Sequence, residues 1–147
     1  MIHNPAEILE QGCAILDGVL CSYGFKREKV VSGKGSGGHF ASTSYVLGNR
    51  KLELHFRFSF GLVTYHFDSV SVNHEELMKA ILGTKGGNNY PGFSDVPADS
   101  FRGLARDLEA FAGPFLTGDG PEFNRYAAIA REQRLLTGFA RLAESEG

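Results

Sequence analysis

Residues 51–60 read KLELHFRFSF, and this stretch constrains the fold of the chain more than any other. Apolar and polar side chains alternate along it without exception: Leu52, Leu54, Phe56, Phe58 and Phe60 against Lys51, Glu53, His55, Arg57 and Ser59. A period of two is typical of a β-strand with one buried side and one side facing solvent. The stretch therefore predicts an antiparallel sheet with a Phe-rich face turned to the core.

The segments on either side of this strand also read as strands joined by short turns. We expect them at residues 25–31, 40–47 and 62–72, with turns at 32–38, Gly48–Asn49 and Gly61. Gly48 at the first position of a two-residue loop favours a type II′ hairpin. The first strand is rich in charge, which suits the edge of a sheet. Together these strands predict a four-stranded antiparallel meander.

Helical spacing of apolar residues predicts one helix before the sheet and three after it. They are expected at 4–23, 73–83, 97–112 and 121–143. Gly24 suits a left-handed C-cap, and Asn73 with Glu76 forms a capping box. Phe115 and Leu116 are expected to plug the core between the last two helices. Residues 1–147 thus read as a single α+β domain of order α-β-β-β-β-α-α-α.

The first predicted helix carries both cysteines and two glycines. Cys13 and Cys21 lie eight residues apart, which is about 12 Å along a helix and too far for a disulfide. Reduced thiols, with no signal-peptide pattern at the N-terminus, indicate a cytoplasmic protein. Gly12 and Gly18 are expected to let the helix approach the sheet closely.

The charge and hydropathy of the chain limit the classes of partner that it can bind. A formal net charge of −2 gives no support to nucleic-acid binding. No apolar run approaches the roughly 20 residues that a membrane span needs, so no membrane association is expected. No cofactor is expected either, and the oligomeric state stays open.

Hairpin arithmetic assigns the strand residues to faces. The Gly48–Asn49 loop pairs Leu47 with Arg50 and therefore Tyr45 with Leu52. A second turn at Phe60–Gly61 would pair Phe58 with Val63, Phe56 with Tyr65 and Leu54 with Phe67. Both turns place the same apolar residues on one side, which supports the assignment because a slip of one residue would turn a whole strand over.

The opposite face gathers the polar side chains, and it is the one place where titratable groups of different kinds are expected to converge. Its members are Ser42, Ser44, Glu53, His55, Arg57, Thr64, His66 and Asp68. In the predicted register His55 lies beside Ser42 and His66, and Glu53 lies near Asp68.

Three interpretations of this face remain open. It could be an ordinary solvated sheet surface, as antiparallel sheets commonly have. It could be a surface for a protein partner or a small ligand. It could also be an acid–base active site built from His55, His66, Glu53 and Asp68. A triad of Ser42, His55 and Asp68 lacks a nucleophile elbow and an oxyanion hole.

A metal site from His55, His66 and a carboxylate has no tight ligand spacing behind it, so no metal is expected. Residues 33–38 match G-x-G-x-x-G, but a strand follows them instead of the helix that phosphate binding needs. The long segment 84–96 contains Tyr90 beside Pro91, and Tyr90 is a candidate contact residue.

Two segments carry a resemblance to known proteins. Residues 20–29 (LCSYGFKREK) and 107–123 (DLEAFAGPFLTGDGPEF) resemble segments of small bacterial domains, including immunity proteins of polymorphic toxin systems. The resemblance implies a cytoplasmic, non-enzymatic domain that binds and neutralises one toxin through a sheet face or loop. The alternative is a small enzyme or ligand-binding domain that uses the His and carboxylate groups of the polar face.

Overall fold

The computed structural model describes residues 5–35, 38–56, 60–83 and 97–146. Arg57 and Tyr90 lie outside these ranges. The strands are β1 (Lys26–Arg27), β2 (Val31–Gly35), β3 (Gly38–Leu47), β4 (Arg50–Phe56), β5 (Phe60–Phe67) and β6 (Val70–Asn73). The helices are α1 (Pro5–Leu20), the 3₁₀ turn η1 (Cys21–Tyr23), α2 (His74–Leu82), α3 (Pro97–Phe111), α4 (Gly113–Thr117) and α5 (Gly120–Glu146).

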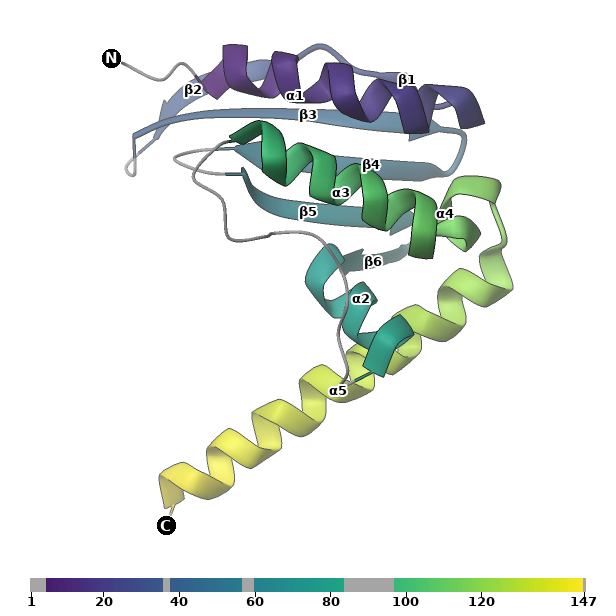
Figure 1. The fold of residues 1–147 in the computed structure, drawn as a ribbon. Helices are drawn as coiled ribbons and strands as arrows, with labels where there is room; N and C mark the ends of the chain where they lie inside the picture. Colours follow the sequence, from purple (N-terminus) through teal and green to yellow (C-terminus); the bar gives the residue numbers. More distant parts are fainter. Residues whose placement is uncertain (1–4, 36–37, 57–59, 84–96, 147) are drawn as a thin grey trace.

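The strands form one antiparallel sheet in which each strand pairs with its neighbour in sequence from β3 to β6 (Figure 1). This confirms the α+β class and the meander. The predicted first strand is wrong as a continuous element, because β1 and β2 pair separately with β3. Most of the glycine-rich segment is therefore strand. Gly33 is needed there because a Cβ atom on it would lie 2.8 Å from Cζ of Phe40.

The predicted strand 62–72 is also wrong as a continuous element. A tight turn at Asp68 and Ser69 separates β5 from β6 and pairs Phe67 with Val70. Asp68 takes a positive φ of 53°, a conformation that Asp tolerates better than most side chains. Asn49 holds this turn, since its carbonyl accepts from the Asp68 N–H and its amide donates to Oδ1 of Asp68 at 2.6 Å.

The first hairpin has the predicted register, with Leu47 opposite Arg50 and Tyr45 opposite Leu52. Gly48 has a φ of 60°, as a type II′ turn requires. The second register is wrong by four residues, since Leu54 pairs with Val63 instead of Phe67. From Arg50 to Leu54 this even shift keeps each side chain on its predicted face. A register irregularity follows, after which Phe56 pairs with Phe60 instead of the predicted Tyr65.

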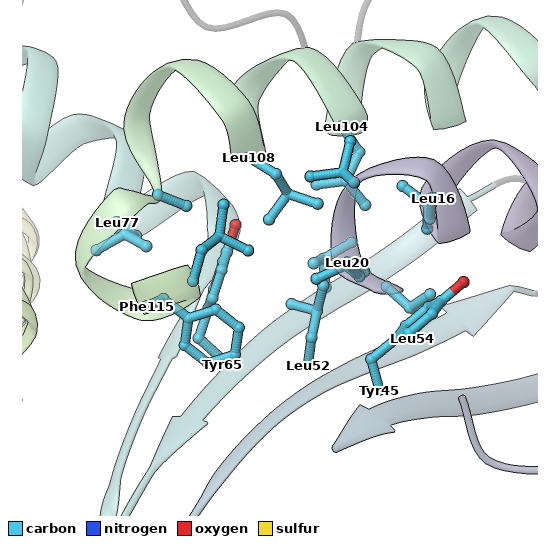
Figure 2. Packing of buried hydrophobic residues seen from close by; sticks show 14 of the residues in the cluster. Leu16, Leu20, Tyr45, Leu52, Leu54, Tyr65, Leu77, Leu104, Leu108 and Phe115 are labelled. Atoms are coloured by element: carbon cyan, nitrogen blue, oxygen red, sulfur yellow. The ribbon is translucent and has the colours of Figure 1, made fainter. Parts of the chain in front are cut away.

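The Phe-rich face of the sheet packs against the helices, and one buried cluster joins both layers. Figure 1 shows α1 and α3 over this face, with α2 and α5 near the β6 edge. Figure 2 shows Leu16 and Leu20 of α1 and Leu104 and Leu108 of α3 packed above Leu52, Leu54 and Tyr65. Gly12 serves the contact between helices and not the sheet, since a Cβ atom there would lie 2.3 Å from the ring of Phe101. Gly18 meets nothing within 4 Å.

The C-terminal helices close the other end of the core. The predicted N-cap is confirmed, because the Asn73 side chain accepts from the N–H of Glu76. The Glu76 carboxylate accepts from the side-chain amide of Asn73, whereas a capping box uses the backbone N–H of the cap residue. The predicted plug is confirmed as well: Phe115 and Leu116 lie in α4 and are buried. Arg50 of β4 donates to the carbonyls of both residues, at 2.7 and 2.8 Å.

Candidate functional site

The face of the sheet opposite the core is here called the open face. It is lined by Ser42 and Ser44 of β3, Lys51, Glu53 and His55 of β4, Thr64 and His66 of β5, and Ser71 of β6. Apart from Ser44, which is buried, these residues are half-buried or exposed. The strands therefore hold polar groups at fixed spacing on a surface that water reaches.

Glu53 is the centre of the open face. Its Oε1 atom lies 2.9 Å from Nε2 of His66, and its Oε2 atom lies 3.4 Å from Nε2 of His55. The other ring nitrogen of His66, Nδ1, lies 2.7 Å from Oγ of Ser71. One carboxylate thus orients two imidazoles, and one of these imidazoles reaches a serine hydroxyl.

The ionised state of the Glu53 carboxylate determines which atoms of these hydrogen bonds carry a proton. The hydrogen bond from His66 lowers the pKa of Glu53, the one from His55 lowers it further, and partial burial opposes both. An ionised carboxylate only accepts, so Nε2 of His66 carries a proton. In the neutral ring Nδ1 is then an acceptor, and the Ser71 hydroxyl donates to it.

The structure brings together only part of the predicted constellation. His55 lies opposite Ser42 as predicted, and Glu53 lies opposite Ser44 and Thr64. The predicted pairing of His55 with His66 is wrong, because Lys51 is opposite His66 and Glu53 lies between the two rings. Asp68 is not near Glu53. It belongs to the turn at the end of β5, where it binds Asn49.

Ser71 is the member of this cluster that the sequence prediction missed. It is the direct cross-strand partner of His66. The prediction of one continuous strand over 62–72 excludes that pairing, because Ser71 reaches His66 only when a turn brings β6 back alongside β5. A glycine would have marked this turn in the sequence, but Asp68 occupies the position with positive φ.

A second polar network, also missed, lies inside the core. The Tyr65 hydroxyl lies 2.6 Å from Nδ1 of His74, and Nε2 of His74 lies 2.9 Å from Oδ2 of Asp107. The side chains of His74 and Asp107 are 1% and 0% exposed. The network joins β5, α2 and α3. His74 is therefore part of the core. The sequence signal for this network was Asp107, which stands at an apolar position of α3.

A third group of polar contacts fastens α1 to the sheet. The Tyr45 hydroxyl lies 3.1 Å from the carbonyl of Cys13 and 2.6 Å from Oδ1 of Asp17. Arg27 of β1 donates to Glu10 at 2.8 Å. Asp17 and Glu10 remain partly exposed, so these contacts lie at the margin of the core.

Among the described residues, no three His, Cys, Asp or Glu side chains are grouped so as to hold a metal ion. In the same part of the chain no helix has the length and apolar character to cross a membrane. No protein-family model, no curated protein and no solved structure matches this chain.

Proposed function

We propose that this chain is a cytoplasmic protein-binding domain of the immunity type, and that its protein partner docks on the open face. The observation that carries the proposal is the position of Glu53, His55 and His66, which stand half-exposed on a sheet whose other face is sealed by the core. Binding through such a face needs no pocket, because a flat array of polar groups can meet a complementary surface.

The resemblance of residues 20–29 and 107–123 to immunity proteins supports the same function and suggests a toxin as the partner. The two segments contribute to the scaffold: Phe25 and Phe115 stack at 5.4 Å between ring centres, and both are buried. On this proposal the resembling segments maintain the fold, and the open face supplies the specificity. The gene beside this one would then encode the toxin.

The test introduces one bulky charge on each of two surfaces. Thr64→Arg places it at the centre of the open face, and Ala110→Arg places it on the exposed side of α3 as a matched control. Both variants and the wild type are used to capture proteins from the source organism and are co-expressed with the product of the adjacent gene.

We expect the wild type and Ala110→Arg to bind that product and to restore growth, and Thr64→Arg to lose both effects. Equal binding by all three proteins would remove the open face from the proposal. Absence of binding and of protection with the wild type would refute the immunity function.

A further inference from the structure

The hydrogen-bonded chain from Ser71 through His66 to Glu53 has the geometry of an activated nucleophile. Such a nucleophile needs a hydroxyl within about 2.6–3.2 Å of a base, and a third group that orients the base. Here the two contacts measure 2.7 and 2.9 Å. Ser71 is exposed, so its hydroxyl is accessible to a substrate.

The order of these hydrogen bonds, from hydroxyl to imidazole to carboxylate, is also correct for proton transfer. Glu53 fixes the proton of His66 on Nε2 and leaves the lone pair of Nδ1 directed at the Ser71 hydroxyl. Oε2 of Glu53 is near His55, so both carboxylate oxygens are engaged. Lys51 lies directly across from His66 on the same face, on the side of His66 away from Ser71.

We propose that Ser71 accepts the acyl group of small activated esters, with His66 as general base and general acid and Glu53 as the positioning residue. This activity goes beyond the proposed binding function, which uses the shape and charge of the open face but no chemistry. The exposed position of Ser71 favours short acyl groups that need no deep pocket to hold them.

The reaction balances without any further reagent. Oγ of Ser71 attacks the ester carbonyl carbon while His66 takes the hydroxyl proton. The tetrahedral oxyanion forms at exposed Ser71, where water can solvate it. Collapse breaks the bond to the alcohol oxygen, and His66 returns the proton to that leaving group. Water, activated by His66, then releases the carboxylic acid and restores the Ser71 hydroxyl.

The probe is p-nitrophenyl acetate with the full chain. We expect a burst of p-nitrophenolate and, in peptide mass spectra of protein quenched in the burst, an acetyl group on Ser71. Ser71→Ala should abolish both signals. Ser69→Ala in the adjacent turn should keep them, since Ser69 is exposed and is not one of the three hydrogen-bonded residues. His66→Gln should slow acylation by at least about 100-fold.

Glu53 is tested as a positioning residue by the pH profile of acylation. The wild-type profile of acylation rate against pH serves as the reference. Glu53→Gln should lower the plateau and alter this profile, and Glu53→Asp should restore part of it. An unlabelled Ser71, or equal acylation of wild type and Ser71→Ala, would overturn the proposal. Either result leaves capture of the partner by the open face unaffected, so the two proposals fail separately.

Discussion

Removing the Tyr65 hydroxyl should destabilise the protein more than removing the Tyr45 hydroxyl, although both rings are 0% exposed. Tyr65→Phe and Tyr45→Phe delete one oxygen each and leave the ring packing in place. The two variants differ in whether the hydrogen-bond partner of the deleted hydroxyl can reach water. Nδ1 of His74 is sealed from water on a side chain that is 1% exposed. Of the two partners of Tyr45, the Cys13 carbonyl belongs to the backbone of α1, and Asp17 has a side chain that is 34% exposed and can turn to solvent.

The expected magnitudes follow from this difference. A buried polar atom left without its partner costs about 1–3 kcal/mol, whereas a typical intramolecular hydrogen bond contributes about 0.5–1.5 kcal/mol net. We therefore expect Tyr65→Phe to lower the free energy of unfolding by about 2 kcal/mol and Tyr45→Phe by about 1 kcal/mol. For a chain of this size these losses correspond to about 6 and 3 °C in Tm.

Urea denaturation monitored by circular dichroism measures both losses, with Tyr23→Phe on the exposed Tyr23 as the control. The midpoints should fall in the order control, Tyr45→Phe, Tyr65→Phe, with the same denaturant dependence in all three. An equal or larger loss in Tyr45→Phe would refute the argument that exclusion of water from His74 sets the cost.

The buried side chains of Tyr65, Tyr45 and Cys13 make the free energy of unfolding depend on pH in the alkaline range. Burial raises the pKa of the Tyr65, Tyr45 and Cys13 side chains in the folded state; the charge of Asp107 raises that of Tyr65 further, and the hydrogen bond to Asp17 raises that of Tyr45. The unfolded chain ionises these groups near their ordinary values of about 8.5 for Cys and 10 for Tyr. Stability is therefore complete below those values and is lost as pH rises above them. Each group contributes a slope of up to about 1.4 kcal/mol per pH unit. Tyr65→Phe should reduce the loss measured between pH 10 and 11, and an unchanged loss would contradict this.

Three further outcomes are expected. Gly12→Ala should cost about 1–3 kcal/mol because its Cβ atom collides with α3, whereas Gly18→Ala in the same helix should stabilise by about 0.5–1 kcal/mol; thermal unfolding of both variants checks the contrast. A thiol reagent should modify exposed Cys21 in the native protein and buried Cys13 only on unfolding, and simultaneous modification of both would contradict the packing of α1. Arg50→Lys should cost about 1.5–3 kcal/mol in denaturant unfolding, because an ammonium group does not reproduce the two bonds to the α4 carbonyls; a loss below 0.5 kcal/mol would show that these bonds matter little.

The sequence was sufficient for the parts of the fold whose signals are local. Alternation over residues 51–60 and Gly48 in the turn predicted the first hairpin to the residue. The signals for the N-cap at Asn73 and the plug at Phe115 were equally local. The facing of each residue from Arg50 to Leu54 also followed, because an error of four residues in the second hairpin leaves it unchanged.

The candidate site was predicted only in part, because its geometry depends on one turn that has no glycine. Asp68 supplies the positive φ there, and without that turn Ser71 could not be placed beside His66. The network of Tyr65, His74 and Asp107 was beyond local signals for another reason. Its members come from three elements that meet only when α3 packs on the sheet.

The division of the core between two halves of the chain has a consequence for how the protein is made. The sheet from β3 to β6 joins neighbours in sequence, so it can form hairpin by hairpin as the chain leaves the ribosome. α1 covers part of its Phe-rich face, and the rest of that face is covered only when α3, α4 and the start of α5 arrive. At about 5–20 residues per second this interval lasts seconds, during which an apolar surface stays exposed. We therefore expect the nascent chain to be most prone to aggregation between the synthesis of β6 and that of α3.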